Sequence, residues 1–257
     1  MQTIIKEQNK NLLLDTDNNQ ITFLDSRYYK TETGPFVPSV TTILDAFPKS
    51  AAFYDWLKKH GENADDIRDE AGRRGSVVHG LTEDYDNGLE VTLMDALGRI
   101  DYKLSEWHMF EKYVEFRSMH PFTIIQSEMN IVSEKLGYAG TLDRLIEMNG
   151  ENILIDIKTS GSIWPSYWLQ LAAYEKLLTE SMGYNPCDKK AILWLNAKTK
   201  TYGKNGAIQG PGWQLIFREE NDTDLKLFEA THQLWLAENG GMKPKQMTYK
   251  LSHKINS

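Results

Sequence analysis

Two stretches decide the fold: Gly137-Tyr-Ala-Gly-Thr-Leu-Asp143, which opens one strand, and Ile153-Leu-Ile-Asp156-Ile-Lys158, which forms the next. Asn149-Gly150 between them is typical of a two-residue β-hairpin turn. Because Asp143 lies early in the first strand and Asp156 late in the second, antiparallel pairing would bring the two carboxylates together. Neighbouring carboxylates repel each other unless a cation joins them. The hairpin therefore predicts a cation site, although Asp143 alone could also be a turn aspartate.

The second strand alternates in character. Its three isoleucines share one face, which we expect to pack against helices, while Asp156 and Lys158 share the other. Mg²⁺ prefers oxygen ligands, and Asp156 and the backbone carbonyl of Ile157 could supply two of them. Lys158 could orient or help deprotonate a bound water and offset charge on a phosphate. A surface Asp–Lys pair on a half-exposed strand is the alternative.

A helix predicted over residues 166–180 follows Trp164-Pro165-Ser166. Gln170 and Tyr174 are four residues apart and therefore lie on one helical face. Both side chains could reach a phosphate or a metal-bound water. The alternative is a solvated Gln170 and a Tyr174 at the edge of the core.

Taken together, these motifs resemble the PD-(D/E)XK nuclease superfamily. The matching residues are G-x-x-D at Gly140 to Asp143, D-I-K at Asp156 to Lys158 and Q-x-x-x-Y at Gln170 to Tyr174. Within the superfamily they resemble the branch that holds the RecB nuclease domain, the CRISPR-associated Cas-four-type nucleases and the mitochondrial genome maintenance exonuclease.

Upstream motifs extend the resemblance to roughly residues 36–196. Arg74-Gly75-Ser-Val-Val-His79 is similar to the R-G-x-x-x-H helix of that branch. The segment from Pro38 to Leu44 and the later Trp56 resemble the lead-in of phage-type exonucleases.

The resemblance implies two further metal ligands. His79 would be one, and an imidazole beside two carboxylates suits Mn²⁺ as well as Mg²⁺. Glu128, on a predicted strand over 123–132, would face the site. Glu83, one turn after His79, could orient the imidazole or be solvated. Without the resemblance, His79 would be expected to pack on the sheet.

The predicted fold is α/β, a restriction-endonuclease-like αβββαβ core with a mixed sheet flanked by helices. We expect an N-terminal β-hairpin extension over 1–35, a nuclease domain with a helical N-terminal part over 36–240, and a polar, basic tail over 241–257.

The expected helices and strands follow from local patterns. The extension would pair residues 11–30 around Asp17-Asn18-Asn19. Ser39 would cap a helix to Phe47, and helices to about Tyr85 would be interrupted at Gly61 and Gly72. Residues Leu104, Trp107, Phe110 and Val114 recur at helical spacing and predict core. The remaining strands are expected at 141–148, 152–158, 190–196 and 213–217, and a closing helix at 222–238.

Composition narrows the class of protein. The 257 residues can bury a sizeable core, and no long apolar run predicts a membrane span. The first ten residues are too polar for a signal peptide, so we expect a cytoplasmic protein of a bacterium or a phage-infected cell. The single cysteine, Cys187, excludes an internal disulfide and the four-cysteine iron–sulfur cluster of several relatives. No P-loop motif is present.

The net charge of −7 argues against sequence-independent coating of DNA. Local basic groups could still follow a phosphate backbone, namely Arg73 and Arg74 before His79, and lysines that include Lys198 and Lys200. The lysines could equally form a solvated hairpin tip.

These inferences predict a metal-dependent deoxyribonuclease that uses Mg²⁺ or Mn²⁺, with Asp143, Asp156, Lys158, Gln170 and Tyr174 in the catalytic site. By resemblance it would be an exonuclease acting on DNA ends in phage or bacterial replication, recombination or repair. A structure-specific flap nuclease, another endonuclease, a ribonuclease and a non-catalytic DNA-binding or assembly protein with this fold are the alternatives. Its protein partner would be a single-strand annealing protein or a helicase.

Overall fold

The computed structural model describes residues 3–7, 10–14, 20–23, 26–196, 212–218, 222–240 and 244. The predicted DNA-binding residues Lys198 and Lys200 lie outside this part of the chain. So do the expected turn at residues 17–19 and all of the predicted tail except residue 244.

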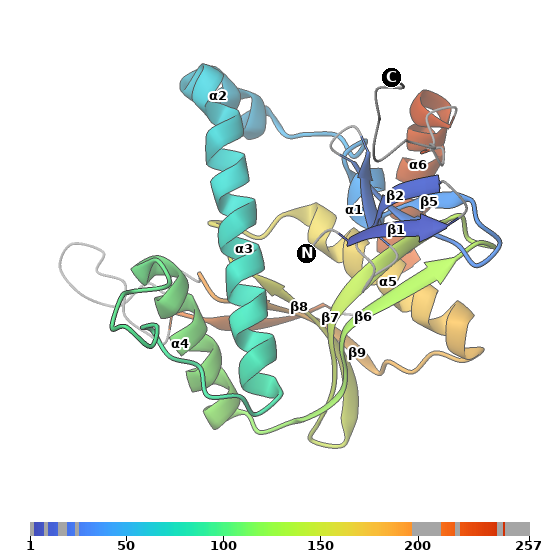
Figure 1. The fold of residues 1–257 in the computed structure, drawn as a ribbon. Coiled ribbons are helices and arrows are strands. Elements are labelled where there is room, and N and C mark those ends of the chain that lie inside the picture. The colour runs from blue at the N-terminus through green and yellow to red at the C-terminus, as the bar shows by residue number, and fades with distance from the viewer. Residues whose placement is uncertain are drawn as a thin grey trace, which may run out of the picture.

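A five-stranded mixed sheet forms the centre of the protein (Figure 1). Its strands are β6 (Thr123–Ser133), β7 (Tyr138–Met148), β8 (Glu151–Lys158), β9 (Lys189–Trp194) and β10 (Gln214–Arg218), in the order β10-β9-β8-β7-β6. Strands β8 and β9 are parallel, and the other neighbours are antiparallel. Helix α5 (Pro165–Met182) makes the crossover between the parallel pair. The predicted α/β class and mixed sheet are confirmed.

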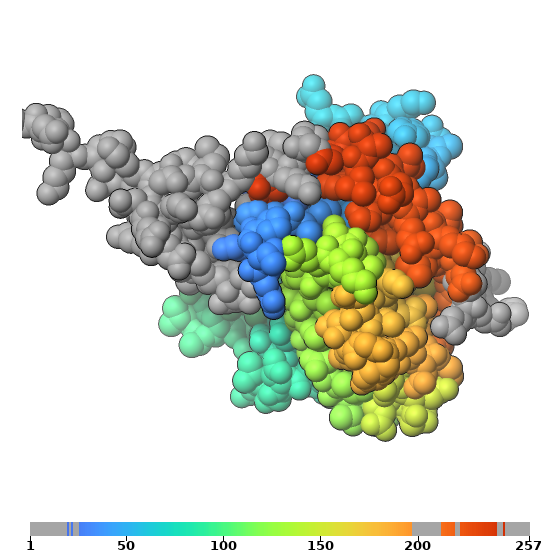
Figure 2. Space-filling model, turned by 90° about the vertical axis from the view of Figure 1, so that its right-hand side faces the viewer, coloured from blue at the N-terminus to red at the C-terminus, as the bar shows by residue number. Residues whose placement is uncertain are grey.

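Helices cover both faces of the sheet. On one face, α3 (Ala64–Asp86) and α4 (Leu104–Met119) pack on a cluster that includes Ile153, Ile155 and Ile157. On the other, α1 (Val40–Leu44), α5 and α6 (Asp222–Asn239) enclose a second cluster around Leu154 and Phe228. Figure 2 shows α6 lying against α5 on the outer side of this second face. The three isoleucines of β8 therefore face the helices α3 and α4, as the alternation in its sequence predicted.

The hairpin between β7 and β8 forms at the predicted dipeptide. Met148 pairs with Glu151, which leaves Asn149 and Gly150 as the turn. Their φ angles are 56° and 79°, as a type I′ turn requires. Ser39 caps α1, since its Oγ accepts from the backbone N–H of Thr42 at 3.0 Å.

Three details of the helical region differ from the prediction. Helix α1 ends at Leu44, and residues 45–47 continue as a turn rather than as helix. Helix α2 (Ala51–His60) and a 3-10 turn (Gly61–Asn63) precede α3, but α3 continues through Gly72. A helix interior tolerates glycine at a cost of about 1 kcal/mol, which the packing of α3 offsets. In α4 the expected core stripe is confirmed only in part. Phe110 is buried as predicted, Trp107 and Val114 are half-buried, and Leu104 is 57% exposed. Met109, Tyr113 and Phe116 supply the rest of the buried face.

The N-terminal strands pair differently from the expected hairpin. Strand β2 (Lys10–Leu14) pairs with β1 (Thr3–Glu7), and β3 (Gln20–Phe23) pairs with β4 (Ser26–Lys30). Strand β5 (Phe36–Pro38) joins β4 in the same sheet, so the predicted boundary at residue 35 falls between two paired strands. Residues 11–30 therefore contribute to two pairings, because short strands with weak alternation do not specify a register on their own.

Among the helices of the described residues, none is long and apolar enough to cross a membrane.

Candidate metal centre

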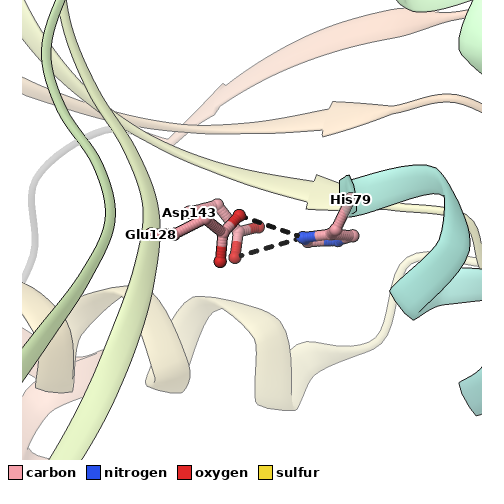
Figure 3. A group of neighbouring side chains, drawn as sticks. All are labelled: His79, Glu128 and Asp143. Carbon is pink, nitrogen blue, oxygen red and sulfur yellow. Dashed lines mark ion pairs between the residues drawn. The ribbon is translucent and has the colours of Figure 1, made fainter. Parts of the chain in front are cut away.

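Three side chains from different elements converge where α3 crosses the sheet (Figure 3). His79 comes from α3, Glu128 from β6 and Asp143 from β7, and one ligand atom of each lies within 4.8 Å of the others. Nδ1 of His79 is 3.6 Å from Oε1 of Glu128 and 3.6 Å from Oδ1 of Asp143. The set is half-buried rather than solvated, with side-chain exposures of 26% for His79 and Glu128 and 10% for Asp143.

Glu128 is held in an unusual backbone conformation. Its φ is +46° inside β6, a region that costs a non-glycine residue roughly 1–3 kcal/mol. The residues on either side pair with β7, Ser127 with Arg144 and Met129 with Leu142. The strain is therefore confined to the residue that faces Asp143, which is typical of functional positions.

The imidazole of His79 is oriented by the backbone of β8. Its Nε2 lies 3.1 Å from the carbonyl oxygen of Ile157. Since a carbonyl only accepts hydrogen bonds, Nε2 carries a proton, and Nδ1 is the atom that faces the carboxylates. Burial alone would lower the pKa of His79, but the charges of Asp143 and Glu128 raise it to about 9. With its pKa raised in this way, His79 also carries a proton on Nδ1 at neutral pH. A cation bound at Nδ1 would replace that proton.

Asp143 and Asp156 lie beside each other, as the hairpin predicts. Oδ2 of Asp143 accepts from the backbone N–H of Ile157 at 2.7 Å, which locks it onto β8. Asp156 is 1% exposed. Burial raises its pKa to about 6, against the opposing effect of Lys158. Its Oδ1 is buried and has no hydrogen-bond partner among the described residues.

The donor set fits a divalent cation. A buried carboxylate oxygen without a partner costs free energy unless a cation or donor reaches it. The group of donors within 4.8 Å of one another is His79, Glu128 and Asp143, a combination of oxygen and nitrogen donors that Mg²⁺ and Mn²⁺ accept. Asp156 lies beside this group through Asp143 and is not one of its members. The one cysteine present, Cys187, is buried and free.

Lys158 begins a hydrogen-bond chain that runs into α5. Its Nζ lies 2.6 Å from Oδ2 of Asp156 and donates to Oε1 of Gln170 at 3.0 Å. Nε2 of Gln170 then donates to the hydroxyl of Tyr174 at 2.9 Å. Burial would lower the pKa of Lys158, but Asp156 and Asp143 outweigh it and raise the pKa. The ammonium has three N–H groups, so one remains beyond Asp156 and Gln170, and the ring of Tyr167 lies 4.4 Å from Nζ.

Gly140 explains how Tyr174 fits against the sheet. A Cβ at this position would lie 2.4 Å from Cε1 of Tyr174, closer than carbon atoms can approach. The ring is 4% exposed and cannot swing away. The glycine of the G-x-x-D motif is therefore needed for close approach of the aromatic ring to β7.

Sequence reasoning missed a buried network behind the site, formed by Arg144 and its partners. Arg144 is 1% exposed. Its Nε donates to Oδ2 of Asp86 at 2.8 Å, and its Nη1 donates to Oε1 of Glu128 at 2.9 Å. Tyr113 also donates to Asp86 at 2.6 Å, and Arg117 lies 3.1 Å from it. An arginine in the middle of an apolar strand was the available signal, because such a charge must find a buried partner.

The other residues predicted near the site are Glu83, Arg73 and Arg74. No side-chain hydrogen bond or ion pair joins Glu83 to His79 within the described ranges, although the two residues are one turn apart in α3. Burial raises the pKa of Glu83, with a further contribution from the charge of Glu128. Arg73 is bound to Glu70 and Glu106, whereas Nε of Arg74 is buried without a hydrogen-bond partner among the described residues.

The fold and the site define an α/β protein with a restriction-endonuclease-like core and a candidate divalent-cation centre. No protein-family model matches the chain, and no curated protein matches its sequence. Among solved structures it is similar to an alkaline exonuclease from Laribacter hongkongensis, with 10% identity over 79% of this chain and 87% of that one, at a TM-score of 0.38. A candidate exonuclease from Eubacterium rectale matches with 15% identity over 85% and 90% of the two chains, at a TM-score of 0.41. These similarities are too distant to indicate a function, so the function is inferred from the site.

Proposed function

We propose that the protein is a metal-dependent deoxyribonuclease that hydrolyses phosphodiester bonds at DNA ends. The observation that carries the proposal is the convergence of His79, Glu128 and Asp143 beside the chain from Asp156 through Lys158 to Gln170. Clustered carboxylates, an imidazole and a buried ammonium are costly to assemble, and a phosphodiester cleaved with the help of a cation uses each of them.

Each residue has a distinct task in this proposal. Nδ1 of His79, Glu128 and Asp143, with Oδ1 of Asp156, would hold Mg²⁺ or Mn²⁺. The carbonyl of Ile157, which the sequence also offered as a ligand, accepts from Nε2 of His79, so we propose that it orients the imidazole instead. When bound, the cation supplies positive charge against the phosphate and lowers the pKa of a coordinated water. Lys158 would use its remaining N–H to position the attacking water or a phosphate oxygen.

Gln170 and Tyr174 are only 8% and 4% exposed, and they bind Lys158 and each other. We therefore propose that they orient the ammonium rather than touch the substrate, a narrower role than the sequence suggested.

The exonuclease mode and a setting in phage or bacterial replication, recombination or repair follow from the motifs and are part of the proposal. A flap or other endonuclease has the same site chemistry. A non-catalytic DNA-binding protein would have no physical reason to keep the strained Glu128 and an unpaired Asp156 Oδ1.

The direct test is digestion of end-labelled linear single- and double-stranded DNA, beside a closed circular control, with Mg²⁺, Mn²⁺ or EDTA. We expect loss of linear DNA alone, blocked by EDTA, and the order of label release gives the polarity. Nicking of the circle would replace the exonuclease by an endonuclease. Absence of cleavage with either metal would contradict the proposal.

The two neighbouring arginines should separate DNA binding from stability. Arg74→Ala is expected to weaken DNA binding and to reduce the slope of log affinity against log salt by roughly 0.7–0.9, the value for one lost phosphate contact. Arg73→Ala should leave that slope unchanged and lower the melting temperature, because the buried carboxylate of Glu106 loses its ionic partner and, within the described residues, keeps only the backbone N–H of Lys103. Salt titrations by fluorescence anisotropy and thermal melts in EDTA measure both quantities. Equal binding losses in the two variants would contradict this assignment.

A further inference from the structure

A small cavity lies between the segment that follows α1 and the start of α5. Its volume is about 260 Å³, and its walls include the rings of Phe47, Phe53 and Trp164 with Lys49 beside them. Pockets for drug-sized ligands occupy roughly 300–1,000 Å³, so this one fits a single ring system rather than a whole cofactor. Trp164 is 43% exposed and can contact a ligand from solvent.

Aromatic side chains continue from the cavity along α2. The rings of Phe53 and Trp56 are stacked at 25° with centroids 6.1 Å apart, and His60 follows at 5.2 Å from Trp56. No residue of α2 is buried, so this aromatic row contributes nothing to the core. Lys58 and Lys59 lie in the last turn of the same helix. Figure 1 shows α2 at the end of α3 that projects beyond the sheet.

The cavity is adjacent to the proposed active site. Trp164 is the N-cap of α5, and the backbone N–H of Tyr167 donates to its carbonyl at 3.1 Å. The ring of Tyr167 in turn lies 4.4 Å from Nζ of Lys158. Three residues, about 4.5 Å of rise along the helix axis, therefore separate Trp164 in the cavity wall from Tyr167, which contacts the Lys158 ammonium.

We propose that the cavity, continued by the Phe53–Trp56–His60 row, binds unpaired bases of a single DNA strand that leads into the site. Every base has a face that stacks on aromatic rings, which gives sequence-tolerant binding. Stacking does not depend on charge, and this chain of net charge −7 repels phosphates as a whole. Binding of bases in the cavity does not require nuclease activity. Only the later cleavage of the bound strand rests on the proposed function.

A second cavity in the described part of the chain does not fit such a ligand. It measures about 600 Å³ and is lined by Glu32 and Glu134 with a single lysine, Lys30, and no aromatic ring. Its carboxylates would repel a phosphate backbone.

Binding of a fluorescein-labelled 16-residue oligo(dT) in EDTA tests the proposal without cleavage. A series of the same oligonucleotide, each with one abasic residue, locates the base that occupies the cavity. For the wild type we expect one or two consecutive abasic positions to weaken binding about 5- to 150-fold, the range for one lost stacking contact. In Trp164→Ala this penalty should disappear, and Trp164→Phe should restore part of it.

Tyr184→Ala is the matched control, because this exposed aromatic lies just past the opposite end of α5. It should show the wild-type abasic pattern, and thermal melts verify that each variant is folded. Persistence of the penalty in Trp164→Ala, or no penalty in the wild type, would overturn the base site. That result would not affect the nuclease proposal, which the cleavage assay tests separately. The expected abasic pattern without any cleavage would support the base-binding site and contradict the nuclease proposal.

Discussion

Asp156→Asn is expected to lose metal-dependent DNA cleavage by about 10³-fold or more, the order seen when one member of a catalytic unit is removed. The substitution keeps the size of a side chain that is 1% exposed but removes the negative charge next to Lys158 and the partnerless oxygen. Initial rates on end-labelled linear DNA with Mn²⁺ measure the loss. DNA affinity in EDTA should change little, because Asp156 is buried behind the surface.

Glu147→Gln is the control, since this exposed carboxylate lies on the same hairpin and should leave the rate unaltered. A second readout does not depend on DNA. Mn²⁺ at a hundredfold excess over its dissociation constant should stabilise the wild type by about 2.7 kcal/mol, and Asp143→Asn should lose most of that gain. Wild-type rates in Asp156→Asn would refute the assignment of the site.

Arg144→Met is expected to lower the free energy of unfolding by about 3 kcal/mol. Breaking a buried ion pair from one side typically costs 3–5 kcal/mol because the other charge stays buried. The lower end applies here, since Tyr113 and Arg117 still contact Asp86. Urea denaturation followed by circular dichroism measures the change.

The comparison for this variant is Arg99→Met, whose side chain is 74% exposed and pairs with Asp95 within one turn. Surface changes of this kind stay within about 0.5 kcal/mol. Equal stability of Arg144→Met and the wild type would show that the network around Asp86 does not hold α3 to the sheet.

The sequence predicted the features that depend on local patterns. The Asn149-Gly150 turn, the alternation along β8 and the helical spacing of Gln170 and Tyr174 each follow from short-range geometry, and each is present. The approach of His79 to Asp143 was predicted only from the resemblance of Arg74–His79 to a known motif, because no local pattern relates α3 to β7.

Tertiary contacts account for what the sequence did not predict. The partners of Arg144 lie on β6 and α3 as well as on its own strand, and no spacing rule connects these elements. Helix α3 is unbroken at Gly72, and β2 pairs with β1. In both cases tertiary packing prevails over a weak local preference. The positive φ of Glu128 likewise has no signal in a strand-like run of residues.

The distribution of the site along the chain sets the order in which it assembles. Asp143 and Ile157, joined by a hydrogen bond, are 14 residues apart, whereas His79 and Ile157 are separated by 78. Closing the longer loop costs about 1.5 kcal/mol more in chain entropy, and distant contacts form more slowly than those within a hairpin. The hairpin is therefore expected to pair first, and the long helix docks onto it later. A cation held by both would then act as a cross-link between the two halves, so amide hydrogens of α3 should exchange more slowly once metal is added.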